Sequence, residues 1–242
     1  MAMTIRPVPL LFDNYAWLLR DDATGTVAVV DPSEARGVED AVHQWGGRLD
    51  LVLLTHHHGD HIHGAEELRE HHGCHVIGAR ADAHRLPPLD QAVAEGDVIA
   101  VGQATARVME TPGHTRGHIA FFFADDAALF CGDTLFSLGC GRLLEGSAEE
   151  MFASLARLAV LPGDTRICCG HEYTESNLRF ALTVEPHNPA LRRRGEAVRA
   201  LRARGEPTVP ALLAEELETN PFLRAPDVAR FAEIRANKDR FR

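Results

Sequence analysis

The chain has 242 residues, of which 45% are hydrophobic and 25% charged, and its formal net charge is −10. This composition is typical of a globular protein with an ample core, and the acidic balance excludes the basic face of a nucleic-acid-binding protein. No apolar stretch is long enough to cross a bilayer, and the start of the chain has no apolar segment typical of a secretion signal. We therefore expect a cytoplasmic protein that binds neither nucleic acid nor membrane.

The five cysteines are odd in number and scattered along the chain, so they do not form a disulfide framework. Free thiols fit a reducing compartment. Cys168 and Cys169 come at the end of an apolar run and are interpreted as buried core residues, so neither is a candidate nucleophile.

Short apolar runs alternate with helical patterns over the first 172 residues, which predicts an α/β fold. We expect strands at 15–19, 26–30, 51–54, 75–77, 104–109, 119–123, 128–130 and 165–169, the last of these being the final strand of the chain. The first two strands, and those at 119–123 and 128–130, have turn residues between them and are expected to form hairpins. Helices are expected at 37–45, 65–71 and 149–158, the third capped by Ser147.

The sequence after Glu172 is rich in leucine, alanine, arginine and glutamate, which predicts helices at 174–184, 190–204, 208–217 and 227–235. Thr208 is expected to cap the third of these helices, with Pro210 in its first turn. We therefore expect two domains, 1–172 and 173–242. The second domain is helical and too small to be stably folded alone.

The sequence from 51 to 64, LVLLTHHHGDHIHG, is an apolar strand followed at once by histidines and an aspartate. The loop offers His56, His58, Asp60 and His61 within six residues. Imidazole and carboxylate are ligands of borderline divalent metals, and an extended turn can direct His56 and His58 one way and the other two elsewhere. The loop therefore predicts two metal positions.

The same pattern recurs three times, because His114, Asp133 and His171 also lie just beyond predicted strands. Strand ends gather at one edge of a sheet, so these residues could meet the histidine loop there. Seven such ligands fit two metal ions that share one carboxylate. Asp31 and His118 are candidates to orient the ligands, since a ligating imidazole usually donates its other N–H to an acceptor.

The motifs THHHGDH, TPGHTRGH, CGDTLF and CGHEYT resemble those of the metallo-β-lactamase superfamily. More narrowly, CGHEYT, GCGR, EPTVP, NPF and the terminal R-x-x-K-D resemble the hydroxyacylglutathione hydrolases, or glyoxalase II enzymes, along essentially the whole chain. The resemblance implies an αββα sandwich, metallo-β-lactamase-like, followed by a C-terminal all-helical domain that helps to bind the substrate.

The resemblance also implies roles for individual residues. It assigns His56, His58 and His114 to the first metal, Asp60, His61 and His171 to the second, and Asp133 to a bridging position. Substrate binding is implied for Arg142, Tyr173, Arg235 and Lys238, of which Arg235 and Lys238 would bind the glycine carboxylate end of glutathione. Lys238 is the single lysine of the chain, and Leu144 stands where many members have an aromatic residue.

The chemistry follows from the ligands. A water that bridges two cations is far more acidic than bulk water, since even one zinc ion lowers its pKa to about 7. The resemblance implies S-D-lactoylglutathione or a related S-(2-hydroxyacyl)glutathione as the substrate, and thus a step of methylglyoxal detoxification. The hydroxide would attack the thioester of this substrate, and the thiolate leaving group needs little acid assistance. We expect two divalent ions, zinc first with iron or manganese as alternatives, and a monomer that takes this small-molecule thioester.

Three other interpretations remain open. A persulfide dioxygenase of the same fold would use one iron with two histidines and a carboxylate, which leaves the other ligands and the helical C-terminal region unexplained. A non-catalytic metal-binding protein would need a closed coordination shell, whereas histidines and carboxylates without thiolates are typical of an open catalytic site. A lactamase would leave the helical region without a role.

The remaining histidines near the predicted site are interpreted as non-ligands: His57, His63, His71, His72 and His75.

Overall fold

The structure is a computed structural model that describes residues 3–241. The chain forms two compact units. Unit 1 contains the chain up to Glu110 together with Gly117–Gly132, and unit 2 contains Thr111–Arg116 together with the chain from Asp133 onward. This division differs from the predicted boundary after residue 172, and that boundary stays a prediction.

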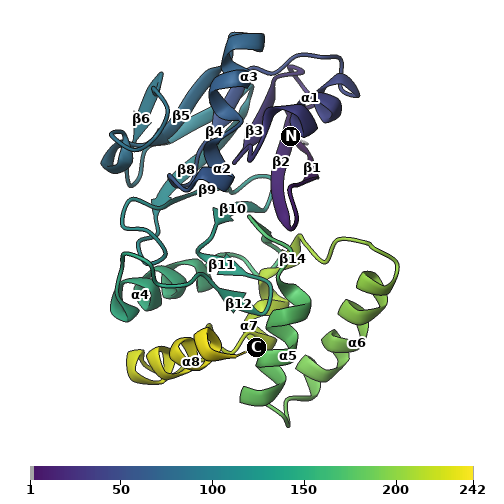
Figure 1. Cartoon of the computed structure of the whole chain (residues 1–242), viewed down its shortest axis with the longest axis vertical. Helices are drawn as coiled ribbons and strands as arrows, with labels where there is room; N and C mark the ends of the chain where they lie inside the picture. The colour runs from purple at the N-terminus through teal and green to yellow at the C-terminus, as the bar shows by residue number, and fades with distance from the viewer. Residues whose placement is uncertain (1–2, 242) are drawn as a thin grey trace. The chain divides into compact units, whose positions relative to one another are not determined.

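Unit 1 contains a mixed six-stranded sheet, drawn in purple to blue in Figure 1. Its strands follow one another in chain order: β1 (Met3–Leu10), β2 (Asn14–Asp21), β3 (Val27–Val30), β4 (Leu51–Leu53), β5 (His75–Ala79) and β6 (Gln91–Val93). The first three strands pair antiparallel and the last four pair parallel. Strands β3 and β4 are almost wholly buried, as expected for continuous apolar runs inside a parallel sheet.

Helices cover the parallel part of this sheet, because parallel neighbours need a crossover between them. Helix α1 (Ala35–His43) joins β3 to β4, and α3 (Ala65–His72) leads into β5. The single helical turn α2 (Gly59–Ile62) lies on the histidine loop after β4, and the 3-10 turn η1 (Arg80–Asp82) follows β5. The chain thus leaves the carboxyl end of β4 directly into the predicted ligands.

The remaining strands of unit 1 form an antiparallel meander: β7 (Val98–Val101), β8 (Ala104–Glu110), β9 (Ile119–Phe123) and β10 (Ala128–Gly132). Its inner face packs on the first sheet through aromatic rings. The ring of Trp17 in β2 meets that of Phe130 edge to face at 6.2 Å, and Phe123 meets Phe130 at 5.8 Å. All three side chains are buried, so they form the core of unit 1.

Unit 2 is mainly helical. It contains α4 (Ala148–Ala159), α5 (Thr174–Val184), α6 (Pro189–Ala203), α7 (Leu213–Thr219) and α8 (Val228–Arg240), drawn in green to yellow in Figure 1. Two short strand pairs lie among them: β11 (Leu135–Phe136) with β12 (Gly139–Cys140), and β13 (Arg166–Cys169) with β14 (Ala211–Leu212). Ser147 caps α4 in a reciprocal capping box with Glu150, which confirms the predicted cap.

The predicted helix at 208–217 is wrong in its first half. Thr208 does not cap a helix, because its N–H and hydroxyl donate to the Glu172 carboxylate at 2.8 and 2.6 Å. The following residues form β14, which pairs antiparallel with β13, so the strand at 165–169 is not the last of the chain. Helix α7 begins only at Leu213.

Strands β1, β6, β7, β11 and β12 were not predicted from the sequence, and helix α8 was predicted too short. Residues 3–10 form strand β1, whose Pro7 and Pro9 weaken the usual strand signal but fit an edge strand of the sheet. Helix α8 runs from Val228 to Arg240 and is capped by Asp227, so it is longer than the predicted helix at 227–235. Among residues 3–241, no helix is both long and apolar enough to cross a bilayer.

Candidate metal centre

The histidine loop of unit 1 is anchored by Asp31 at the end of β3. The Asp31 carboxylate accepts the Thr55 N–H at 2.8 Å and the Thr55 hydroxyl at 2.6 Å, and it lies 3.1 Å from His61 Nδ1. Asp31 has a φ of +51°, a left-handed conformation that aspartate tolerates better than most residues. A buried carboxylate at the start of the loop therefore fixes both its backbone and one of its imidazoles.

Hydrogen bonds at Nδ1 leave the Nε2 atoms of His56 and His61 available as ligands. The carboxylate beside His61 Nδ1 requires a proton on that nitrogen. The Thr55 hydroxyl already donates to Asp31, so at 3.1 Å it accepts from His56 Nδ1. His56 Nε2 then faces His58 Nδ1 at 3.1 Å, a pair of nitrogens that one metal ion can bind together.

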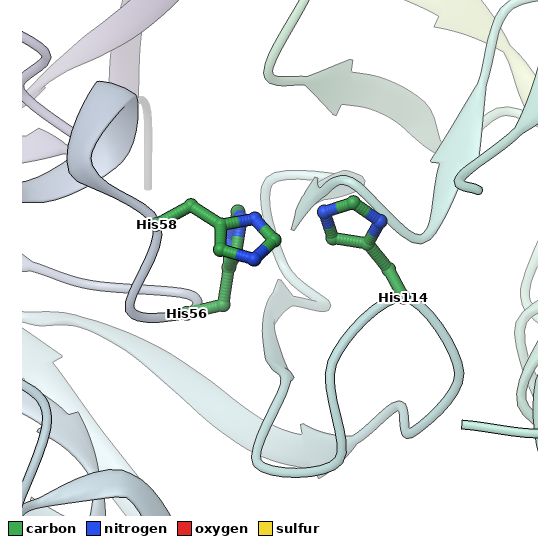
Figure 2. A group of neighbouring side chains, drawn as sticks. All are labelled: His56, His58 and His114. Carbon is green, nitrogen blue, oxygen red and sulfur yellow. The ribbon is translucent and has the colours of Figure 1, made fainter. Parts of the chain in front are cut away.

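Figure 2 shows His56 and His58 on this loop, together with His114 on the loop after β8. His118, predicted to support the ligands, stacks on the His56 ring at 4.8 Å. Asp60 is partly exposed, and Asn14 donates to its backbone oxygen at 3.0 Å and to its carboxylate at 3.1 Å. The role of Asn14 was missed, because an asparagine at the start of a strand gives no signal in sequence.

The histidines that were interpreted as non-ligands have other surroundings. His57 pairs with Asp82 at 3.1 Å, and His71 and His72 flank the carboxylate of Glu39 at 3.1 and 2.9 Å. His63 and His75 are exposed.

In unit 2, Asp133 lies between two imidazoles. Its Oδ2 is 3.5 Å from His114 Nε2 and 3.4 Å from His171 Nε2. His114 Nδ1 donates to the Arg142 carbonyl at 2.8 Å, so Nε2 is the nitrogen that can bind a metal ion. All three side chains are buried. A carboxylate with an imidazole nitrogen on either side is a donor set that suits a bridging position between two cations.

Gly141 is required beside this carboxylate. A Cβ atom added there would lie 1.9 Å from the Asp133 backbone oxygen, a separation that no packing allows. The second glycine of the GCGR motif is therefore required for steric reasons, in addition to the substrate-binding role predicted for Arg142.

A cavity of about 400 Å³ lies within unit 2. His114 and Asp133 line it, and so do all four residues predicted to bind the substrate, Arg142, Tyr173, Arg235 and Lys238. Tyr173 stacks on the His171 ring, with the ring centroids 4.6 Å apart and the planes almost parallel. Leu144 also lines the cavity and is 57% exposed. The predicted substrate residues thus share one cavity with two predicted metal ligands.

The cations of this cavity differ in how accessible they are. The Arg142 side chain is 65% exposed and lies 3.5 Å from Asp239. Arg235 is buried, donates to the Cys140 carbonyl at 2.7 Å and to Asp239 at 2.9 Å, and lies over the Phe222 ring. Its guanidinium is therefore largely occupied by the protein itself.

Lys238 is half-buried between the rings of Phe180 and Phe241, and its Nζ donates to the backbone and hydroxyl oxygens of Ser176 at 3.3 and 3.2 Å. Desolvation, followed by the positive charges of Arg235, Arg179 and Arg142, lowers the pKa of Lys238 to about 8, although Asp239 opposes the shift. Lys238 thus titrates near physiological pH.

The five cysteines are free and buried, as predicted. Burial raises the pKa of Cys140 to about 11 and that of Cys169 to about 12, and it raises the pKa of Cys168 further still. A thiol with such a pKa carries almost no thiolate at neutral pH, so none of these residues can serve as a nucleophile.

Comparisons with known proteins show the family of the chain. Residues 10–171 match the family model of the metallo-beta-lactamase superfamily, and residues 172–241 match that of the hydroxyacylglutathione hydrolase C-terminus. The hydroxyacylglutathione hydrolase of Methylococcus capsulatus is 53% identical over 99% of each chain, and that of Rhodospirillum rubrum is 56% identical over 96% of this chain and 90% of its own. The chain belongs to the hydroxyacylglutathione hydrolase family of the metallo-β-lactamase superfamily.

Solved structures give the same fold. The crystal structure of ETHE1 from Myxococcus xanthus is 27% identical, with a TM-score of 0.71 over 97% of this chain and 90% of its own. A B3 metallo-beta-lactamase, BLEG-1, reaches the same TM-score at 21% identity, over 91% of this chain and 99% of its own. The predicted fold class, a metallo-β-lactamase-like α/β fold with a C-terminal helical region, is confirmed.

Proposed function

We propose that this enzyme hydrolyses the thioester of S-D-lactoylglutathione and related S-(2-hydroxyacyl)glutathiones to glutathione and a 2-hydroxy acid, as a step of methylglyoxal detoxification. The observation that carries the proposal is the cavity of unit 2, which His114 and Asp133 line together with the cations Arg142 and Lys238. Such a cavity suits an anionic substrate whose reacting bond must come close to metal ligands. The names of the relatives support the same activity.

The donor sets fit two divalent ions, for which zinc is our first choice and iron or manganese are the alternatives. His56, His58 and His114 would bind one ion, Asp60, His61 and His171 the second, and Asp133 both. The hydrogen bonds at Nδ1 of His56, His61 and His114 support this assignment, because each leaves Nε2 as the ligand atom. The ions would supply an acidified water as nucleophile and a Lewis acid at the carbonyl oxygen.

The protein's own residues would bind and orient the thioester. Lys238 and Arg142 would pair with the carboxylates of glutathione, and Tyr173 would pack against its thiol portion beside His171. Arg235 would act mainly through its charge, because its Nη atoms already donate to Cys140 and Asp239. The cation cluster would thus hold the carboxylates while the scissile bond lies near Asp133.

A thioester suits this site better than an amide or ester. The leaving group is a thiolate whose conjugate acid has a pKa of about 8.5, so it departs without a dedicated general acid. The buried, protonated cysteines also fit hydrolysis by activated water and not by a covalent thiol intermediate.

The persulfide dioxygenase alternative is not favoured, because residues 172–241 match the hydrolase C-terminus and the relatives at 51–56% identity carry the hydrolase name. We further propose two domains, 1–172 and 173–242, which agree with the regions matched by the two family models. A cytoplasmic monomer is also proposed, and the free cysteines support a reducing compartment.

The test is a thioester assay with S-D-lactoylglutathione on purified enzyme, followed by chelator treatment and reconstitution with zinc, iron or manganese. We expect hydrolysis that the chelator abolishes and that two ions per chain restore. Oxygen uptake with glutathione persulfide is measured on the same samples. If one iron per chain and oxygen consumption were found without thioester cleavage, the enzyme would be an oxidoreductase and the proposal would be wrong.

A further inference from the structure

The hairpin formed by residues 135–140 has an unusual setting in unit 2. It follows Asp133 and Thr134 directly, pairs β11 with β12, and turns at Ser137 and Leu138. Leu138 has a φ of +58°, a left-handed conformation that leucine rarely adopts. Phe136 and Cys140 of this hairpin line the substrate cavity.

Side chains from later in the chain bind the backbone of every residue from 136 to 140. Asn220 Nδ2 donates to the carbonyls of Phe136 at 3.2 Å and Gly139 at 3.0 Å, and Asn177 Nδ2 donates to that of Ser137 at 3.0 Å. Arg235 donates to the carbonyl of Cys140. The Leu138 N–H donates to Glu216 Oε2 at 2.9 Å.

Glu216 is the centre of this set. It is wholly buried, accepts from Asn220 at 3.0 Å, and forms a very short ion pair with Arg194. Arg194 also donates to the hydroxyls of Ser137 at 2.9 Å and Thr219 at 2.6 Å. Both members of the ion pair therefore bind the hairpin. Glu216 accepts the Leu138 N–H, and Arg194 donates to the Ser137 hydroxyl.

Stability alone does not explain this arrangement, because replacing a buried ion pair with apolar residues of similar volume is often neutral or stabilising. What apolar side chains cannot supply is an acceptor for the buried N–H of a left-handed residue. Glu216 provides that acceptor for Leu138 and so fixes the turn of the hairpin.

The hairpin in turn sets the aromatic wall of the cavity. The Phe136 ring meets the Tyr173 ring at 5.2 Å and the His171 ring at 6.0 Å, both near perpendicular. Tyr173 stacks on His171. A change in the turn at Leu138 would therefore move Phe136 and, through it, the ring proposed to pack against the substrate.

We propose that Glu216 is a positioning residue for the substrate cavity, acting through the Leu138 N–H and the 135–140 hairpin on Phe136 and Tyr173. The identity of the ligand rests on the proposed function, whereas the control of the hairpin does not. Glu216 itself is not among the residues that line the cavity.

The test compares three variants with the wild type. The double variant Arg194→Met/Glu216→Leu removes the ion pair and the acceptor together without leaving a lone buried charge. The rescue variant Arg194→Met/Glu216→Gln also removes the charge of Arg194, but it keeps an acceptor oxygen of the same reach for the Leu138 N–H. Glu185→Gln is the control, because it breaks an ion pair of unit 2, with Arg224, that does not contact the hairpin.

Hydrogen exchange of the Leu138 amide is the first readout. We expect at least about a tenfold faster exchange in the double variant, since one buried hydrogen bond is lost, with α4 amides unchanged and with near wild-type rates in the rescue variant and the control. Unchanged exchange at Leu138, or equal acceleration throughout unit 2, would overturn the proposal. If the double variant does not fold, Glu216→Asp replaces it, since it keeps a carboxylate beside Arg194 but shortens the side chain that accepts the Leu138 N–H.

Binding and kinetics are the second readout, measured well below the Tm of each variant. We expect the Kd of S-methylglutathione and the KM of the thioester to rise about tenfold in the double variant, with kcat within about threefold and with both constants restored in the rescue variant. A variant with lowered Tm but unchanged Kd and KM would show a merely structural role and overturn the proposal. If the wild type neither binds glutathione nor cleaves the thioester, the proposed function fails, while the exchange data still test the hairpin.

Discussion

Lys238 gives the sharpest prediction, because its pKa of about 8 lies close to neutral pH. The cation that binds a carboxylate is present below pH 8 and is lost as the pH rises through that value. The protonated fraction falls from about nine-tenths at pH 7 to about one-tenth at pH 9, which is the titration of one group with a pKa near 8. The Kd of S-methylglutathione should therefore rise about tenfold between pH 7 and pH 9.

The strength of the interaction between Lys238 and the ligand carboxylate sets the upper limit of this change in Kd. A hydrogen bond to a charged group contributes about 1.5–3 kcal/mol, so Lys238→Met should weaken binding about 10- to 150-fold at pH 7 and abolish most of the pH dependence.

The stability of the protein changes with pH in the direction opposite to ligand binding. The pKa of Lys238 is lower in the folded protein than in the unfolded chain, so the free energy of unfolding gains from this group between about pH 8 and pH 10.5.

Isothermal titration calorimetry with S-methylglutathione between pH 6.5 and 9.5 measures the effect, and this thioether avoids ionisation of the ligand's own thiol. Lys238→Arg is the matched control, since arginine stays protonated throughout and reports any titration of the ligand's amino group. A wild-type profile that runs parallel to that of Lys238→Arg would refute the reasoning.

Three further predictions follow from single observations. Gly141→Ala places a Cβ on the Asp133 carbonyl, so we expect at least about a hundredfold loss of kcat/KM and lower metal content by elemental analysis; activity within a few fold of wild type would contradict this steric role. Ser147→Ala removes one half of the capping box with Glu150 and should cost about 1 kcal/mol, lowering the Tm by about 2–4 °C in thermal denaturation without loss of activity. The five buried thiols should be inert to Ellman's reagent in the native enzyme at pH 8 and react fully in denaturant, and rapid native labelling would argue against their burial.

Local patterns of the sequence predicted most of the fold. The helix at 174–184 was predicted with the observed bounds, and the hairpin of β9 and β10 was predicted from turn residues between apolar runs. The errors have tertiary causes. Thr208 has the composition of a helix cap, but its partner Glu172 is 36 positions earlier in the chain, and no local pattern shows that contact.

The candidate site was predictable where ligands follow strands, because the ligand type and the strand end are both visible in sequence. Its supporting contacts were less visible. The Asp31 carboxylate was suspected, but its bonds to Thr55 and His61 depend on the parallel pairing of β3 with β4. Glu216 was not suspected at all, since a glutamate in a helix normally faces solvent and only the folded chain buries it against Leu138.

The most direct test of the central claim is the hydrolysis of S-D-lactoylglutathione by the wild type and by Asp133→Ala, with metal content measured on both samples. The account predicts that the wild type cleaves the thioester with two divalent ions per chain, and that Asp133→Ala loses activity by orders of magnitude together with part of its metal. Full activity and full metal content in Asp133→Ala would contradict the bridging role of this carboxylate. Absence of thioester cleavage by the metal-loaded wild type would contradict the proposed function itself.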